Sequence, residues 1–352
     1  MQESRIPDRE PPDSRSRLSE PDLVLVDALQ YAPRAPWTRI GRAIGADPTT
    51  AARRWERLRA AGLAWVTAYD APDAATIAYV EVRCRPGSLD AVTAALAGMA
   101  WVFSLDVTAG DYDLLVSVAA ADLPRLGQSV HRLIGGLPGV RSTRTRLALT
   151  FFGEGGDWRM GAMEPALRTG LAASRSPRRP RGGTRTPAEQ DPEDRALKTA
   201  LGADGRMGYT ELGAAAGMSE HTARRRLQRM IRTGSISFRC DLARPLAGLS
   251  TMVVFRGVVP HGRLEATGSA VARMEQVRMC ASVSGPHNLL IAVWLPGLSG
   301  IASFEASLAE RFPELEVKDR SVALQSAKRM GWLLDIDGRA VRRVPLGLPE
   351  HD

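Results

Sequence analysis

Arginine is concentrated in two short segments that lie far apart in the chain. The first holds Arg53, Arg54, Arg57 and Arg59, and the second holds Arg224, Arg225, Arg226, Arg229 and Arg232. Guanidinium groups bind phosphate oxygens and guanine edges, and threonine suits phosphates or a thymine methyl group. The residues expected to contact nucleic acid are Thr49, Thr50, Arg53, Arg54, Arg57, Ser219, His221, Thr222, Arg224, Arg225 and Arg229.

The composition agrees with a polyanionic partner. Lys and Arg number 47 against 39 Asp and Glu, which gives a net charge of +8. A polyanion is therefore the expected class of partner. Together with the helix-turn-helix pattern and the absence of a secretory signal described below, the expected partner is double-stranded DNA and the expected location is cytoplasmic and nucleoid-associated. A surface of solvated arginines is the plain alternative for one such helix, but the same placement in two segments argues against it.

No group of residues in the sequence resembles a catalytic or metal centre. The five histidines are scattered, the cysteines at positions 84, 240 and 280 lie far apart, and no glycine-rich phosphate loop follows a strand. We expect no catalytic residue, metal or cofactor. The first twenty residues lack an apolar core, so no secretory signal is expected. The uncharged run from Met279 to Phe304 is interrupted by Gly285 to Asn288 and by Pro296-Gly297, so no membrane span is expected either.

The two arginine segments belong to a duplication. Residues 22–66 align without a gap on residues 194–238 at a shift of 172, with 15 identical pairs among 45. Residues 77–149 align in the same way on residues 252–324 at a shift of 175. Each half therefore contains a short first module and a longer second one.

The short module has the pattern of a helix-turn-helix. In the second copy, residues 195–201 and 209–216 have helical spacing, and Ser219 stands where an N-cap belongs before a third helix that ends at Gly234. The first copy has Asp47 as the cap and Pro48 at the first helical position. A strand-like stretch follows each third helix and is expected to form either a wing or a crossing strand.

The longer module has the order β-α-β-β-α-β, which is the ferredoxin-like unit. The predicted fold class is therefore α+β, with two winged or helix-turn-helix domains and two ferredoxin-like domains in tandem. Boundaries follow from composition: a disordered N-terminus (1–19), helix-turn-helix domain 1 (20–69), α/β domain 1 (75–152), a basic flexible linker (157–191), helix-turn-helix domain 2 (192–241), α/β domain 2 (250–327) and a C-terminal tail (328–352). The linker prediction depends on residues 168–188, which carry six arginines and no acid.

Three features together resemble the Lrp/AsnC (leucine-responsive/asparagine regulator) family, in which the second module is called the RAM domain. They are the capped third helix Ser219 to Met230, the strand linker, and the turn Gly110-Asp-Tyr-Asp113 before a buried strand. The resemblance covers both halves. It implies a transcriptional regulator whose α/β module dimerises and binds a small effector, commonly an amino acid. It also implies an effector site at Gly110, Tyr112, Asp113, Thr143 and Thr145.

The second copy departs from this pattern, because Asn288 replaces Asp113, and Lys318 and Arg320 replace the two threonines. We therefore expect any effector site in the first copy, although a turn residue and a strand pair would explain Asp113 and the threonines equally well. One chain is expected to act as a pseudo-dimer whose α/β modules pack through their sheets, with further homo-oligomers. The alternatives are an enzyme resembling siroheme decarboxylases, which share the two modules, and a metabolite-binding adaptor without DNA binding.

Overall fold

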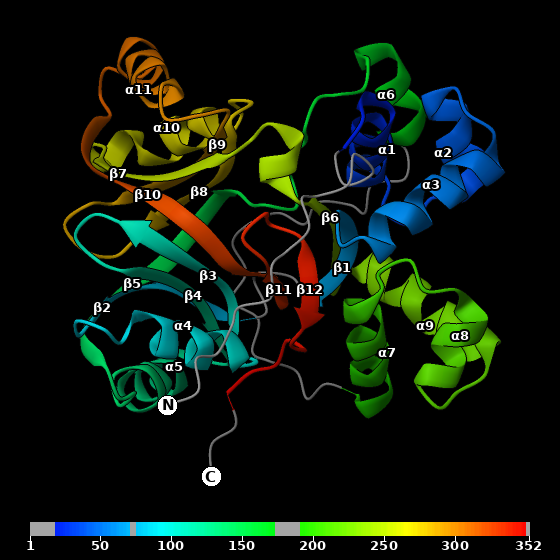
Figure 1. The fold of residues 1–352 in the computed structure, drawn as a ribbon, viewed down its shortest axis with the longest axis horizontal. Helices are drawn as coiled ribbons and strands as arrows, with labels where there is room; N and C mark the ends of the chain where they lie inside the picture. Colours follow the sequence, from blue (N-terminus) through cyan, green and yellow to red (C-terminus); the bar gives the residue numbers. More distant parts are fainter. Residues whose placement is uncertain (1–17, 71–74, 173–190, 350–352) are drawn as a thin grey trace, which may run out of the picture.

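The computed structural model describes residues 18–70, 75–172 and 191–349. The strands of the two α/β modules lie on one side of the molecule, and two small helical units lie on the other (Figure 1). This arrangement confirms the predicted α+β class, with two helix-turn-helix units and two ferredoxin-like modules in tandem. The predicted disordered N-terminus up to residue 17 and part 173–190 of the predicted linker lie outside the described residues.

Each helix-turn-helix unit consists of three short helices, which are α1 (Glu20–Tyr31), α2 (Trp37–Ile44) and α3 (Pro48–Ala60), then α7 (Pro192–Ala203), α8 (Tyr209–Ala215) and α9 (Glu220–Thr233). The side chains of Asp47 and Ser219 cap the third helices, as predicted. The turn before each third helix contains a glycine in the left-handed region, Gly45 with φ 67° and Gly217 with φ 68°. Glycine adopts this conformation without the steric cost of a Cβ, which favours the same turn in both copies.

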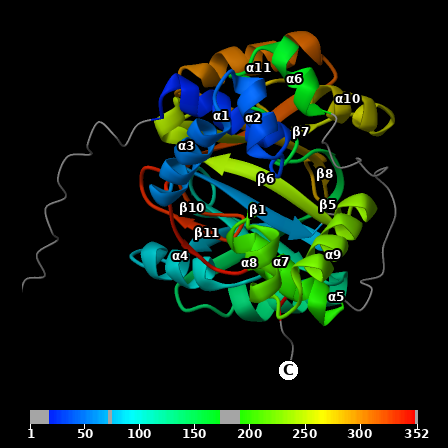
Figure 2. The same ribbon diagram turned by 90° about the vertical axis from the view of Figure 1, so that its right-hand side faces the viewer.

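The strands after the third helices cross each other. β1 (Ala64–Asp70) and β6 (Ile236–Leu242) form an antiparallel ribbon in which Thr67 lies opposite Arg239. These two residues are equivalent in the repeat, so the centre of the ribbon is also the centre of the internal pseudo-twofold symmetry. Figure 2 shows the ribbon running between the two helical units. Of the two expectations for these strands, the crossing strand is correct.

Both α/β modules have the predicted element order. The first comprises β2 (Thr76–Cys84), α4 (Leu89–Gly98), β3 (Val102–Ala109), β4 (Leu114–Ala120), α5 (Leu123–Ser129), a π-helical turn (Val130–Ile134) and β5 (Val140–Gly153). The second comprises β7 (Thr251–Val258), a 3₁₀ turn (His261–Arg263), α10 (Leu264–Val271), β8 (Val277–Val283), β9 (Leu289–Leu295), α11 (Gly300–Arg311) and β10 (Glu316–Arg329). The strand orders β3-β4-β2-β5 and β8-β9-β7-β10 are both ferredoxin-like.

The two sheets join edge to edge and close into a ring of eight strands. β5 pairs with β8, and β10 pairs with β3 as well as with β7. Inside the ring lies an apolar cluster to which both modules contribute, including Tyr79 and Leu115 from the first and Met252, Leu290 and Trp294 from the second. Helices α4 and α5 cover one module on the outside, and α10 and α11 cover the other (Figure 1). The predicted packing of the modules through their sheets is confirmed.

Two predicted boundaries are wrong. The linker was expected to begin at residue 157, but Trp158, Met163 and Leu171 are buried in the core of the first helical unit, and residues Pro165–Ala172 form helix α6. The few apolar side chains of this segment outweigh its polar composition because α1 and α2 offer them a surface to pack against.

The predicted C-terminal tail is folded as well. Beyond β10, the strands β11 (Trp332–Leu334) and β12 (Ala340–Arg343) form a hairpin. The Trp332 indole packs against Trp65 with ring centroids 6.3 Å apart, and the amide of Ala340 donates to the carbonyl of Gly62 at 2.9 Å. The hairpin therefore fills the space between the ring of strands and the crossing ribbon.

Candidate nucleic-acid interface

The third helices, α3 and α9, are candidate recognition helices because each buries one stripe and exposes the opposite face. The buried residues are Ala51, Trp55, Leu58, Ala223, Leu227 and Met230. This spacing is the helical repeat of an apolar face that packs on the other two helices of the unit. The predicted contact residues of the first turns lie on the remaining face.

Three of the predicted DNA-contacting arginines are engaged inside their own unit. Arg57 donates to Asp22 on α1 at 2.5 Å, and Arg54 lies 3.6 Å from the same carboxylate. In the second copy Arg229 donates to Asp194 on α7 at 2.5 Å. These arginines hold the third helix against the first helix, a role that the sequence prediction missed. The sequence held one indication of this role, because an aspartate occurs at the same position of the first helix in both copies of the repeat.

The two aspartates differ in their surroundings. The side chain of Asp22 is 1% exposed, whereas that of Asp194 is 18% exposed. Burial alone would raise the pKa of Asp22, but hydrogen bonds from Arg57 and Ser19 outweigh it and lower that pKa. The carboxylate of Asp22 is therefore stabilised in its charged form.

Two of the predicted contact arginines remain exposed and without a hydrogen-bond or ion-pair partner among the described residues. They are Arg53 on α3 and Arg225 on α9, which occupy the same position of the repeat, and Thr49, Thr50 and His221 are exposed beside them. An unpaired exposed guanidinium keeps all its donors available for a phosphate or a guanine.

The other predicted residues of the second helix have partners. Ser219 accepts from the amide of Thr222 at 3.2 Å as the N-cap, and its hydroxyl also contacts the Thr222 hydroxyl at 3.0 Å. Arg224 pairs with Glu220 at 2.9 Å and lies over the ring of Tyr209, 4.6 Å from its centroid. Arg224 is thus less available for a ligand than Arg225.

The two helical units are held together by a reciprocal exchange of arginines that the sequence prediction missed. Arg34 of the first unit donates to the carbonyl of Met207 at 3.0 Å, and its equivalent Arg206 donates to the carbonyl of Ala35 at 2.9 Å. Arg206 also stacks on Trp37 at 3.9 Å. Burial, with a contribution from the charge of Arg34, lowers the pKa of Arg206 to about 10. These contacts and the crossing ribbon fix the spacing of the two recognition helices.

The five predicted effector residues do not gather into one pocket. Tyr112 lies in the cluster inside the ring of strands, next to Arg256. Thr143 and Thr145 lie opposite Val82 and Val80, whose side chains belong to the core on the other face of the sheet. Directly opposed residues of an antiparallel pair share a face, so the threonines and Tyr112 are separated by the sheet itself.

Asp113 and Gly110 lie in the turn between β3 and β4. Oδ2 of Asp113 accepts from the amide of Cys84 at 2.7 Å, and Gly110 has φ 140° with Ser321 close by. In the second copy Asn288 makes the equivalent contact, accepting from the amide of Val259 at 3.0 Å, and it also donates to the carbonyl of Val259 at 2.8 Å. Both side chains therefore close the same turn.

Neither a metal centre nor a membrane span accompanies these features in the described part of the chain. Residues 18–70, 75–172 and 191–349 contain no group of three or more His, Cys, Asp or Glu side chains placed to hold a metal ion. Within the same ranges, none of the helices combines the length and the apolar character needed to span a bilayer.

Comparisons with known proteins match this architecture. The family model of the AsnC-type helix-turn-helix domain matches residues 18–59 and 191–231, and the model of the Lrp/AsnC ligand binding domain matches residues 77–155. The chain is 30% identical over 139 residues to the HTH-type transcriptional regulator FL11 of Pyrococcus horikoshii, an alignment that covers 38% of this chain and 91% of the relative. FL11 of Pyrococcus abyssi is 27% identical over 139 residues, with the same coverage.

A solved structure matches both halves at once. The siroheme decarboxylase NirDL superposes with a TM-score of 0.58 and 11% identity, covering 89% of this chain and 93% of that chain. At this identity the likeness concerns the fold alone. It shows that a solved structure has the same tandem arrangement of the two modules.

Proposed function

This chain belongs to the Lrp/AsnC family of helix-turn-helix transcriptional regulators, and from that premise we propose that a single chain binds double-stranded DNA sequence-specifically through both recognition helices. Named relatives of the chain are transcriptional regulators, which is not an enzymatic class. One chain carries two helix-turn-helix units related by an internal pseudo-twofold, so it has the arrangement that a dimer of single-module chains would provide.

The observation that carries the proposal is the matched pair Arg53 and Arg225. Each lies in the second turn of a capped recognition helix, is exposed, and has no partner among the described residues. Neighbouring arginines are neutralised by Asp22 and Asp194, so the free positive charge is placed on the outward face. If these helix faces were merely solvated, there would be no reason for paired and unpaired arginines to occupy the same positions in both copies.

We assign distinct roles to the exposed residues. Arg53 and Arg225 would contact phosphates or guanine edges, and Thr49, Thr50 and His221 at the helix starts would contact the phosphates or the floor of the groove. Arg57 and Arg229, whose side chains are about half exposed (45% and 50%), would orient the helices and reach the backbone of the DNA at the edge of the contact.

We also propose that an amino acid or a related small molecule binds near Asp113 in the first α/β module. Oδ1 of Asp113 has no partner among the described residues, and an ionised carboxylate can pair with an ammonium group. Because Tyr112 and the two threonines lie on opposite faces of the sheet, the proposed site is reduced to the turn around Gly110 and Asp113. Further homo-oligomers of these pseudo-dimers, and a nucleoid-associated location, follow as expectations of a DNA-binding protein.

Selection of bound DNA from a random pool would identify a site, and the affinity for that site then tests the proposal. The double substitution Arg53→Ala/Arg225→Ala should weaken binding at least about tenfold and reduce the slope of log K against log salt by about one for each phosphate that the protein no longer neutralises. The matched control is Arg59→Ala, because Arg59 lies on the same helix but pairs with Glu56 at 2.9 Å. An unchanged affinity and salt slope in the double variant would refute the assignment.

A further inference from the structure

A group of buried arginines beneath the crossing ribbon carries more positive charge than its acids can neutralise. Nη2 atoms of Arg239, Arg244 and Arg278 all donate to Oδ1 of one carboxylate, Asp241, at 2.8, 2.7 and 3.0 Å. The three side chains are 3–8% exposed. Buried charges in proteins are normally paired, so three guanidinium groups on one carboxylate leave this region short of negative charge.

A second pair nearby does not correct the imbalance. Arg329 donates to Asp106 at 2.8 Å, which neutralises that arginine alone. Among the described residues, four buried guanidinium groups therefore bind two buried carboxylates, Asp241 and Asp106. Burial lowers the pKa of Arg244 to about 9, and the neighbouring Arg329 and Arg239 act in the same direction against the attraction of Asp241.

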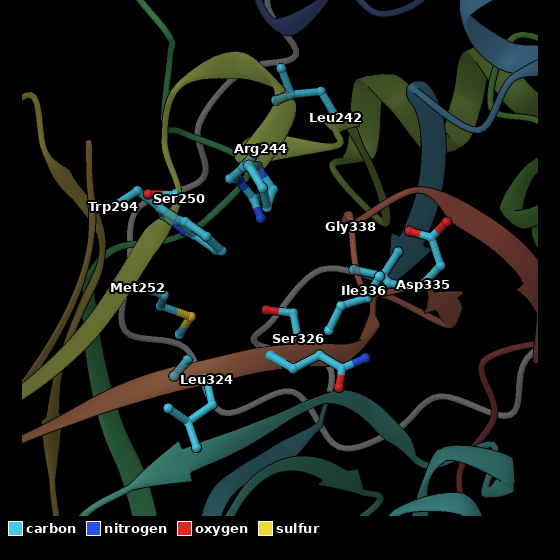
Figure 3. Close-up of a pocket in the computed structure, with 14 residues that line it drawn as sticks. Leu242, Arg244, Ser250, Met252, Trp294, Leu324, Ser326, Asp335, Ile336 and Gly338 are labelled. Carbon is cyan, nitrogen blue, oxygen red and sulfur yellow. The ribbon is translucent and has the colours of Figure 1, made fainter. Parts of the chain in front are cut away.

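A cavity of about 160 Å³ adjoins this group (Figure 3). Its walls come from Leu242 to Met252, from Trp294 near the end of β9, from Ala323 to Ser326 in the middle of β10, and from the turn between β11 and β12. An engineered cavity of about 150 Å³ in another protein holds benzene, so this one has room for a ring or a short branched chain.

Two residues that line the cavity carry donors without partners among the described residues. Of the Arg244 guanidinium, only Nη2 has a hydrogen bond within these ranges, and Nε is buried without a partner there. The indole Nε1 of Trp294 is also buried without a partner in the described chain, and the Arg244 guanidinium stacks on its ring at 4.3 Å. Figure 3 shows Arg244 pointing toward the open space, with Ser326 opposite it and Met252 and Ile336 beside it. A carboxylate in the lining, that of Asp335, accepts from the amides of Asp337 and Arg339.

We propose that this cavity binds a small organic carboxylate with a short apolar or aromatic group. The carboxylate would accept hydrogen bonds from Arg244 and Trp294 and supply the missing negative charge, and the apolar group would pack on Met252, Leu324 and Ile336. The site is distinct from the turn around Asp113, and nothing in its chemistry requires an ammonium group on the ligand.

The position of the cavity links a bound carboxylate to the recognition helices. Arg244 shares Asp241 with Arg239, and Asp241 lies in β6 opposite Trp65 of β1. A carboxylate that draws Arg244 into the cavity would weaken its bond to Asp241 and shift the ribbon that spaces the two helical units. This consequence for DNA binding rests on the proposed function, whereas binding of the carboxylate does not.

Titration calorimetry on the full chain without DNA tests the site, with benzoate as the probe and benzamide as its neutral control. Benzoate should bind with a Kd below about 1 mM, and benzamide should bind at least about tenfold more weakly, because only the charged probe neutralises Arg244. Absence of benzoate binding at this concentration, or equal binding of benzamide, would overturn the proposal.

Two variants locate the binding. Arg244→Met should bind benzoate at least about tenfold more weakly, and it is expected to fold because Arg239 and Arg278 still neutralise Asp241. Trp294→Phe keeps all the charges and removes only the indole donor, so a loss of about threefold is expected. Arg320→Met, an exposed arginine paired with Glu305 on the outside of β10, is the control that should leave the affinity unchanged.

Nuclear magnetic resonance gives a readout that folding defects would not imitate. The indole N–H peak of Trp294, assigned by its absence in Trp294→Phe, should move when benzoate is added to the wild-type chain. Benzoate binding that leaves this peak in place, or that persists in Arg244→Met with the same affinity, would show that the carboxylate binds elsewhere and would refute the site.

Discussion

The two α/β modules carry opposite charges at the place where they meet. Glu81 on β2 and Arg256 on β7 are equivalent positions of the repeat, and their side chains form a buried ion pair of 3.1 Å across the pseudo-twofold axis. Arg146 on β5, equivalent to Ser321 on β10, lies 3.5 Å from Glu81, and Asp319 pairs with Arg256 on the other side. Each module therefore surrounds its central charge with partners of the opposite sign.

This difference shows how the duplicated modules have become specific for each other. Two copies of the first module in the same arrangement would bring Glu81 against Glu81, and two copies of the second would bring Arg256 against Arg256. Like charges buried together are strongly unfavourable, so pairing of a first module with a second module is favoured over pairing of two like modules. The recognition helices have diverged much less, because Arg53 and Arg225 are still the same residue type in the same position.

The largest expected effect comes from removing the shared anion of the first module. Glu81→Gln should lower the free energy of unfolding by about 3–5 kcal/mol, because Arg146 would stay buried without a carboxylate and Arg256 would keep only the partly exposed Asp319. Urea unfolding measures the change. Arg320→Gln, which breaks the exposed pair with Glu305, should cost less than about 1 kcal/mol and serves as the control. Equal costs for the two variants would contradict the specific role of the buried pair.

A smaller effect distinguishes the two helical units. Asp22→Asn should destabilise the protein by about 1–3 kcal/mol, because it removes the charge on a buried side chain that holds Arg57. Asp194→Asn at the equivalent, more exposed position should cost less than about 1 kcal/mol. Thermal or urea unfolding of the two variants under the same conditions checks the order. The comparison fails if Asp194→Asn proves the more damaging change.

The two turns that precede β4 and β9 are expected to differ in ligand response. If an amino-acid-like effector binds, Asp113→Asn should abolish its effect on DNA affinity, a coupling of about 1–3 kcal/mol, while Asn288→Ala should leave it intact. Asparagine retains an oxygen to accept from Cys84, so the Asp113 variant should stay folded. DNA affinity measured with and without an amino-acid mixture tests this. A response that disappears only in Asn288→Ala would place the effector in the second module.

The smallest effect is the pH dependence that Asp22 of the first unit contributes. The pKa of Asp22 lies below its ordinary value of 3.8 in the folded chain, so its stabilisation is complete above 3.8 and is lost as the pH falls through the lowered pKa. The stability difference between wild type and Asp22→Asn should therefore be full at about pH 6 and shrink below 3.8. Urea midpoints of both proteins across this range measure it. A difference that is constant with pH would exclude the ion pair as its source.

Much of the architecture follows from local sequence patterns. The caps Asp47 and Ser219, the left-handed glycines of the turns and the apolar spacing of each third helix act within a few residues, so they were predictable, as was the element order of both α/β modules. The boundaries at residues 157 and 328 were not, because segments with few apolar residues order only when another part of the chain offers them a surface.

The sequence by itself determined the duplication, the two kinds of module and the position of the arginine-rich helices. Only the tertiary structure decided which of those arginines are free, because Asp22 and Asp194 lie 35 residues before the arginines that they bind. It also decided that Glu81 meets Arg256, 175 residues away, and that four buried arginines share two carboxylates beside a cavity. Charge pairing depends on distance in space, and spacing along the chain carries no record of it.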